Sequence, residues 1–189
     1  MINKLSKTIL AILLIGGLLA IFGCGKVITE STTPLETAET VEPIATTDIS
    51  GVETDPIETD VFTGDVVWRV LDVSDEGESI VSADNYAFDA KRGKFIIIEF
   101  SVLNNSEDTK ILYDLNVIDN KGRVFTLCLP AYGYISVERA CAVTEIIPDN
   151  EYSFDAPFDV SPDSEGLILE VTDLSRTGTK EKAYIDLGI

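Results

Sequence analysis

The chain has 189 residues and carries 33 acidic against 14 basic side chains, a formal net charge of −19 at pH 7, with no histidine. The missing histidine excludes Ser-His-Asp and Cys-His nucleophilic sites and the common zinc sites, and the strong negative charge argues against a nucleic-acid partner. We therefore expect neither a cofactor nor a metal, and the length suits one domain behind an N-terminal segment.

Residues 1–23 predict a lipoprotein signal peptide. Two lysines precede an uncharged apolar run over 8–23, which is how a secretory signal begins. The run is shorter than the roughly 20 residues that a stable membrane span needs. It ends in Ile21-Phe22-Gly23-Cys24, which resembles the lipobox of bacterial lipoproteins. Cys24 is therefore expected to carry the lipid that anchors the chain to the cell membrane, on its extracellular side. The alternative is an uncleaved signal anchor with an incidental cysteine.

Residues 24–60 are expected to be the lipidated cysteine followed by a disordered linker. This segment is acidic and rich in threonine, and it shows no apolar alternation. A segment of low hydrophobicity and one sign of charge buries too little apolar surface to offset the entropy lost on ordering. From 61 to 189, apolar and polar residues alternate with a period of two, which predicts one all-β domain.

The predicted strands are short and closely spaced. The clearest covers 151–160, where Pro157 favours an edge position or a bulge. The strand 94–103 is apolar on both faces, as expected of a central strand, and the sequence at 119–122 predicts a hairpin turn. Such a series favours a two-sheet antiparallel sandwich. In chain order, strands are expected over 66–73, 85–90, 94–103, 111–118, 123–129, 142–147, 151–160, 167–171 and 183–187.

Several of these segments also resemble a bacterial domain family. The run from Lys91 to Ser106 has a glycine, a basic residue, a phenylalanine, an aliphatic stretch and Asn-Asn-Ser. It resembles the core motif of the immunoglobulin-like, immunoprotective extracellular protein family, many of whose members have no assigned function. Segments 115–122, 147–151, 154–160 and 166–169 resemble further family motifs in the same order. The resemblance implies an immunoglobulin-like β-sandwich on a lipoprotein stalk and brings no catalytic residues.

Cys128 and Cys141 are the cysteines that remain besides the anchor. The outside of a cell permits disulfides, and an even number of remaining cysteines in an exported domain suggests that they pair. A bridge over this loop length would stabilise the fold by roughly 3 kcal/mol. The alternative is two buried free thiols that pack as small apolar groups.

The loop from Pro130 to Tyr134 is the candidate contact region for a ligand. Tyr132 and Tyr134, on either side of a glycine, are suited to stack on a sugar or on a partner side chain. Alternatively, they cover the edge of the sandwich. A second run, from Asp159 to Glu170, has a spacing like that of a calcium-binding EF-hand loop. Ser164 replaces the glycine that such a loop requires, so an ordinary turn is expected there.

These features favour a cell-surface lipoprotein whose domain is a non-catalytic binding module for an envelope protein or a glycan. The first alternative is a structural or accessory envelope lipoprotein without a ligand of its own. A minor alternative is an enzyme that uses paired carboxylates, because the many acids offer pairs, although none stands out in the sequence.

Overall fold

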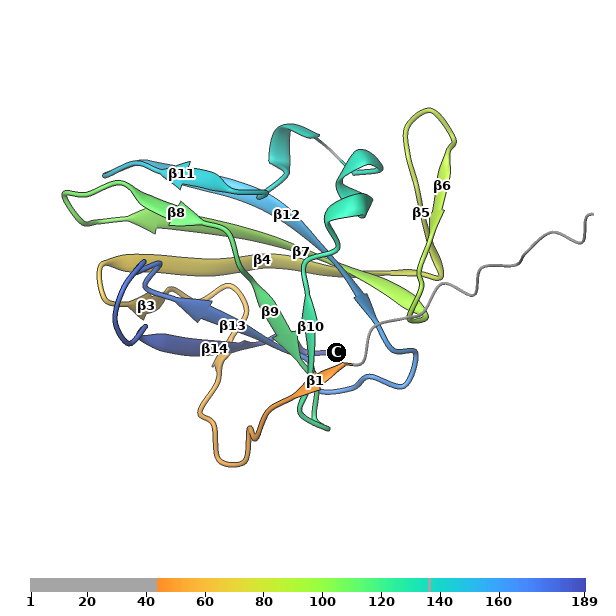
Figure 1. Cartoon of the computed structure of the whole chain (residues 1–189), viewed down its shortest axis with the longest axis horizontal. Coiled ribbons are helices and arrows are strands. Elements are labelled where there is room, and N and C mark those ends of the chain that lie inside the picture. The colour runs from red at the N-terminus through yellow and green to blue at the C-terminus, as the bar shows by residue number, and fades with distance from the viewer. Residues whose placement is uncertain (1–43, 136) are drawn as a thin grey trace, which may run out of the picture. The chain divides into compact units, whose positions relative to one another are not determined.

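The computed structural model describes residues 44–135 and 137–189, and almost all of its regular structure is β-strand (Figure 1). Within these residues, no helix combines the length and the apolar character that a membrane crossing requires. The elements are β1 (Ala45–Thr46), β2 (Asp55–Pro56), β3 (Val61–Thr63), β4 (Val66–Gly77), β5 (Ser79–Val81), β6 (Ala87–Asp89), β7 (Lys94–Asn104), β8 (Lys110–Leu112), β9 (Asn116–Ile118), β10 (Arg123–Thr126), the 3-10 helices η1 (Leu129–Gly133) and η2 (Val137–Arg139), β11 (Thr144–Ile146), β12 (Glu151–Val160), β13 (Ile168–Thr172) and β14 (Lys182–Asp186).

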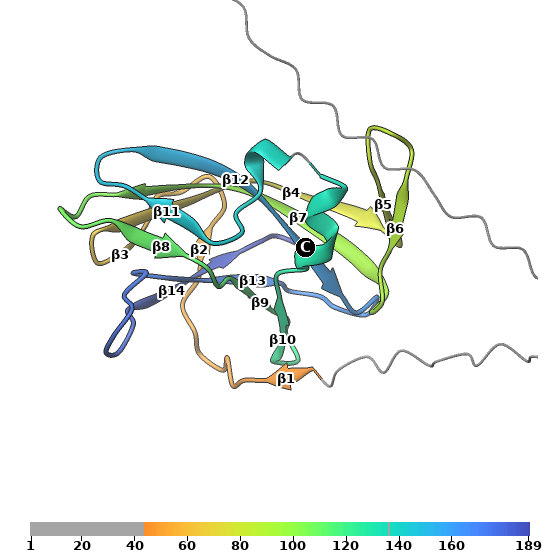
Figure 2. The ribbon, with the colours of Figure 1, turned by 45° about the horizontal axis from the view of Figure 1, so that its top comes forward.

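Two sheets form the body of the domain. One has six strands in the order β1-β10-β9-β13-β14-β2, and the other has four in the order β12-β7-β4-β3. Figure 2 shows them as two layers. Strands β4, β7 and β12 take the places of strands A, B and E of an immunoglobulin domain, and β10, β9, β13 and β14 take those of C′, C, F and G. The all-β antiparallel sandwich predicted from the sequence is confirmed, with an immunoglobulin-like strand order.

The main core lies between the two sheets and is centred on Trp68. Its indole ring lies 5.9 Å from the ring of Phe100 on the neighbouring strand β7. Its Nε1 donates hydrogen bonds to Thr63 Oγ1 and to the carbonyl oxygen of Thr172, both at 3.0 Å. Because Thr172 belongs to β13, this single side chain ties the four-stranded sheet to the six-stranded one.

Strand β7 is buried on both faces, as its sequence predicts. Ile96, Ile98 and Phe100 face the main core. On the opposite face, Phe95 belongs to a second, smaller cluster and Ile97 packs against it. The β5–β6 hairpin and η1 supply the rest of this second cluster, so the central strand has a hydrophobic cover on each side.

The folded part begins earlier than the expected boundary at residue 61. Ala45 of β1 pairs with Val124 of β10, and Asp55 of β2 pairs in parallel with Ile185 of β14. Ile44 and Ile57 also pack against the main core. Assigning all of 24–60 to the linker is therefore wrong for residues 44–60. These strands are too short and too polar to give an alternation signal, and pairing with the sheet edges orders them. The remainder of the expected linker lies outside the described residues.

One predicted strand divides into two. The segment 111–118 was expected to be continuous, but β8 pairs with β11 while β9 joins the six-stranded sheet. Residues 113–115, which connect them, belong to neither strand. An alternating pattern cannot reveal such a division, because both parts keep the same period of two.

The predicted hairpin turn at 119–122 is present and is fixed by a buried carboxylate. Asp119 is fully buried and accepts hydrogen bonds from the backbone N–H groups of Lys121 and Arg123, at 3.0 and 2.9 Å. Its other oxygen lies 2.6 Å from the Arg123 guanidinium. Gly122 has a φ of 74°, and a Cβ there would stand 2.1 Å from the carbonyl oxygen of Thr47. Position 122 of the turn therefore requires glycine.

The Asn-Asn-Ser motif closes the end of β7. Asn104 is fully buried, and its Nδ2 donates to the carbonyl oxygens of Asp108 and Ile146 at 2.8 and 2.9 Å. Its Oδ1 accepts from the backbone N–H and the hydroxyl of Ser106, at 3.0 and 2.6 Å. The motif therefore holds the turn after β7 against β11, which is a structural role.

Candidate functional site

Tyr132 lies in the core rather than on the surface. Only 8% of it is exposed, and its hydroxyl oxygen lies 2.7 Å from Cys141 Sγ. Burial raises the pKa of the Tyr132 phenol far above its usual range and raises that of the Cys141 thiol to about 11. The expectation that Tyr132 contacts a ligand is therefore not supported by its position, because η1 turns this side chain inward.

Tyr134 has a covering role. Its ring stacks on Phe88 of β6, with 5.0 Å between the ring centroids. Both rings pack against the second cluster, which contains Phe95 of β7. This arrangement matches the alternative in which the tyrosine covers the sandwich.

Cys128 and Cys141 are free thiols in the structure, in contrast to the expected bridge. Cys141 is buried in the main core, whereas Cys128 is partly exposed and packs against the second cluster. Burial also raises the pKa of Cys128. The 3-10 helices between the two residues direct each thiol into a different cluster, and the spacing of the cysteines in the sequence does not reveal this.

The acidic run that begins at the end of β12 is engaged in protein contacts. Asp159 accepts hydrogen bonds from the backbone N–H groups of Lys91 and Arg92. Asp163 forms ion pairs with Lys121 and Arg123. Across the part of the chain that the structure describes, no group of three or more possible ligands is placed to hold a metal ion.

A cross-strand carboxylate pair is joined by an arginine. Glu99 of β7 pairs in register with Asp155 of β12, and Arg139 of η2 lies 2.6 Å from the first and 3.2 Å from the second. Burial raises the pKa of Asp155 above its usual value, and the opposing effect of the nearby Arg139 is smaller. Because one guanidinium binds both carboxylates, this pair holds η2 on the sheet.

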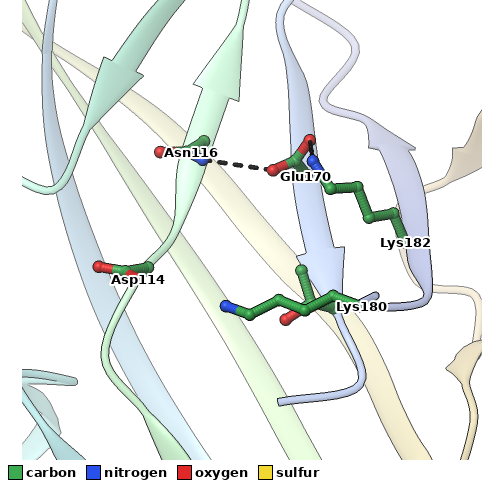
Figure 3. Close-up of a pocket in the computed structure, with 6 residues that line it drawn as sticks. Asp114, Asn116, Glu170, Lys180 and Lys182 are labelled. Carbon is green, nitrogen blue, oxygen red and sulfur yellow. Dashed lines mark hydrogen bonds and ion pairs between the residues drawn. The ribbon is translucent and has the colours of Figure 1, made fainter. Parts of the chain in front are cut away.

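A polar cavity of about 320 Å³ lies on the outer face of the six-stranded sheet (Figure 3). The strand register explains why polar side chains line this cavity. Val117, Leu169 and Ile185 face the core, so the alternate residues of their strands face outward. Strand β13 pairs with both β9 and β14, which brings β9 beside two strands from the end of the chain. The lining residues are Asp114, Asn116, Glu170, Thr172, Lys180 and Lys182.

Glu170 forms the floor of this cavity and is electrically neutralised. Its side chain is only 12% exposed, and Oε2 lies 2.7 Å from Lys182 Nζ. Asn116 Nδ2 donates to Oε1 at 3.3 Å, and the Tyr184 hydroxyl donates to Oε2 at 3.4 Å. The hydrogen bond to Glu170 raises the pKa of Lys182. Figure 3 shows the carboxylate between the amide and the ammonium group.

Lys180 has a different environment. Its Nζ donates to the Tyr113 hydroxyl at 3.0 Å and lies 4.8 Å from the centroid of that ring. Among the described residues, no carboxylate forms an ion pair with Lys180, and Asp114 likewise has no ion-pair or hydrogen-bond partner. In Figure 3 the Lys180 side chain extends across β13 towards β9. The cavity thus contains one unneutralised cation and one unneutralised anion.

A second cavity of about 180 Å³ adjoins the first, because Asp114 and Asn116 line both. Its wall is more apolar and includes Tyr113 and Leu129, which are 36% and 59% exposed. We call the two cavities together the sheet furrow. The furrow joins a charged half to an apolar half on one face of the domain.

The sequence did not predict the sheet furrow. Its charged half combines residues from β9, from β13, and from β14 and the segment that leads into it. Asn116 and Glu170, which are hydrogen-bonded there, lie more than 50 positions apart in the sequence. Lys180 lies in no predicted strand, and Asp114 lies in the part of the predicted strand 111–118 that is not a strand in the structure. Alternation within a strand also does not show which strands become neighbours.

Comparisons with known proteins support the fold. No family model matches the chain, and no curated protein matches it. Several solved structures resemble the domain. The yjhA protein from Bacillus subtilis has a TM-score of 0.51 at 14% identity, over 70% of this chain and 99% of its own. A functionally unknown protein from Listeria monocytogenes EGD-e has a TM-score of 0.50 at 11% identity, over 70% and 83%. A candidate lipoprotein (ycdA) from Bacillus subtilis has a TM-score of 0.49 at 16% identity, over 72% and 40%.

At these identities the first two likenesses concern the fold alone. They agree with a shared sandwich architecture and assign no activity to this chain. Membership in the immunoprotective extracellular protein family stays a prediction, since no family model matches.

Proposed function

We propose that this chain is a lipid-anchored protein of the cell envelope, on the extracellular side of the membrane, whose immunoglobulin-like domain is a non-catalytic binding module. The sheet furrow is its binding surface. The observation that carries the proposal is the furrow itself, where an unneutralised cation, an unneutralised anion and exposed apolar side chains share one face.

The proposed anchor is Cys24, which lies outside the described residues. It follows a basic start, an uncharged apolar run and the lipobox-like Ile21-Phe22-Gly23. Two acyl chains on this thiol would hold the protein firmly, because each buried methylene contributes roughly 0.8 kcal/mol. Only 19 residues separate Cys24 from Ile44, so the domain would operate near the membrane.

The non-catalytic part of the proposal rests on the chemistry of the furrow. Glu170 is held by Lys182, Asn116 and Tyr184, so it is a poor general base. The arginine-bridged pair of Glu99 and Asp155 has a structural task under η2. These contacts favour recognition over acid–base chemistry.

Metabolic labelling tests the anchor. Bacteria that produce the full chain are fed an alkyne fatty acid, and the protein is isolated and examined for label. Wild type is expected to be labelled, Cys24→Ala is expected to lose all label, and Cys128→Ala serves as the matched cysteine control that keeps it. Label that persists on Cys24→Ala would remove the proposed anchor.

Cosedimentation with isolated cell walls tests the binding surface. The full-length chain in detergent micelles is compared with Thr126→Arg, which places a long charged side chain at an exposed position in the furrow. Thr109→Arg adds the same charge at an exposed position outside the furrow. We expect retention of wild type and of Thr109→Arg, and loss of Thr126→Arg. Equal retention of all three would exclude the furrow, and no retention of any would favour an accessory lipoprotein without a ligand.

A further inference from the structure

At least six of the eleven lysine and arginine side chains that the structure describes form ion pairs with carboxylates. They are Arg69, Lys94, Lys121, Arg123, Arg139 and Lys182. This is expected where acids outnumber bases by 33 to 14. Lys180 instead lies half-buried over the Tyr113 ring and bonds only its neutral hydroxyl. Its positive charge therefore remains available to a ligand.

Asp114 supplies the complementary charge. It lines the same cavity as Lys180, comes from the opposite wall before β9, and is bound by no other described side chain. The inner pair of Glu170 and Lys182 is already neutral. The cavity thus has no net charge of its own inside a strongly acidic molecule.

From these observations we propose that the charged half of the sheet furrow binds a small zwitterion, an amino acid or a short peptide with both ends free. The ligand carboxylate lies at Lys180 Nζ and its ammonium group at the Asp114 carboxylate. This inference rests on the proposed binding function and names the ligand class of that site.

The overall charge of the protein favours a zwitterion over an anion. A formal charge of −19 repels a polyanion such as a teichoic acid, and one available lysine cannot offset that repulsion. A zwitterion carries no net charge and meets no such barrier. Pairing both ends at once also gives selectivity, because a molecule with only one charged end leaves the opposite residue unpaired.

The size and the polar floor fit the same ligand class. A volume of about 320 Å³ lies at the low end of the range for small-molecule sites. Asn116 directs its amide nitrogen to Glu170, and Figure 3 shows its oxygen turned the other way, where it can accept an N–H from a peptide. The adjoining apolar half at Tyr113 and Leu129 offers space for a small apolar side chain.

The test is a titration of the full-length chain in detergent micelles with the dipeptide alanyl-alanine, followed by calorimetry or by amide NMR shifts of β9 and β14. Two matched probes remove one charge each: N-acetyl-alanyl-alanine lacks the ammonium group, and alanyl-alanine amide lacks the carboxylate. We expect the free dipeptide to bind about fivefold more tightly than either derivative, which corresponds to the loss of one partly exposed ion pair.

Variants assign the two ends. Lys180→Gln is expected to weaken binding of the free dipeptide about fivefold and to abolish its advantage over the amide. Asp114→Asn is expected to abolish its advantage over the acetylated form. Lys121→Gln removes the same charge in the hairpin turn, outside the furrow, and should leave affinity unchanged. Circular dichroism confirms that each variant is folded.

Equal binding of all three probes, an unaffected Lys180→Gln variant, or no binding of the dipeptide would each overturn the inference. The results also distinguish failure of this inference from failure of the proposed binding function. If the dipeptide fails while Thr126→Arg still prevents retention on cell walls, the ligand class is wrong and the binding surface stands. If both fail, the binding function falls as well.

Discussion

The hydroxyl of Tyr132 and the thiol of Cys141 form a hydrogen bond inside the core, with 2.7 Å between oxygen and sulfur. This contact joins the start of the η1–η2 segment to its end. It also involves the thiol that was predicted to form a disulfide with Cys128. The segment is therefore closed by packing and by a hydrogen bond.

Loss of this hydrogen bond should be measurable. Tyr132→Phe keeps the ring but leaves the Cys141 thiol without its partner, so we expect a loss of about 1 kcal/mol in the free energy of unfolding. Tyr134→Phe is the matched control, because its hydroxyl forms no hydrogen bond with any residue that the structure describes. Urea unfolding, followed by the fluorescence of the chain's single tryptophan, compares the two. Equal stability of both variants would contradict a role for the contact.

The thiols should react in a fixed order. Cys128 is partly exposed, whereas Cys141 is buried with a pKa raised to about 11. Since the thiolate is the reactive form, a thiol reagent at pH 8 should modify Cys128 first and Cys141 only on unfolding. Mass spectrometry of the non-reduced, denatured protein should then show both cysteines alkylated. A product two hydrogens lighter and resistant to alkylation would establish the disulfide instead.

Asn104 should be among the most sensitive polar positions. Asn104→Ala removes four hydrogen bonds and leaves the buried carbonyl oxygen of Ile146 without that donor. We expect a loss of about 3 kcal/mol in the free energy of unfolding. Asn105 is exposed, so Asn105→Ala should change stability by less than about 0.5 kcal/mol. Similar effects of the two substitutions in urea unfolding would refute the structural role of the motif.

The contacts of Asp163 with the hairpin at 119–122 should make the stability of the fold decrease in acid. Hydrogen bonds from Lys121 and Arg123 lower the pKa of Asp163 from 3.8 to about 2. A folded-state pKa below the unfolded one stabilises the fold above about pH 4, and this contribution is lost as the pH falls towards 2. Carboxyl NMR titration should find the low midpoint in wild type and a higher one in Lys121→Gln. The side chain is 63% exposed, so 1 M salt should also raise the midpoint. A midpoint that is the same in both proteins would contradict the ion pair.

Residues 44–60 should contribute to stability. A chain that begins at residue 61 lacks β1 and β2 and the packing of Ile44 and Ile57, each worth about 1 kcal/mol. We expect it to unfold at a lower urea concentration than a chain that begins at residue 44. Coincident unfolding curves would place the true boundary at 61.

The sequence predicts the strands better than their partners. In β12, the alternation assigns Phe154 and Phe158 to the core, and both are buried there. Pro157 indicates an edge or a bulge, and the structure shows the edge, because β12 is the outermost strand of its sheet. These features depend on residues that are close together in the sequence, within one strand, and so they can be predicted from it.

The sheet furrow depends on contacts between distant segments, and that is why the sequence does not reveal it. Lys180 acquires its special environment only because Tyr113, far along the chain, lies beneath it. Strands β1 and β2 were not predicted for the same reason, since pairing with β10 and β14 is what orders them. The two tyrosines at 132 and 134 attract attention as a motif, but a 3-10 helix turns one of them inward.

The close approach of Thr47 to Gly122 constrains the protein across a long span of chain. Asparagine and aspartate tolerate a positive φ, and many hairpins of this type accept them. Here any side chain would collide with the main chain of an N-terminal segment whose Thr47 N–H also donates to the Gly122 carbonyl at 2.7 Å. A substitution at 122 would therefore separate β1 from β10 and also remove the packing of Ile44 against the main core.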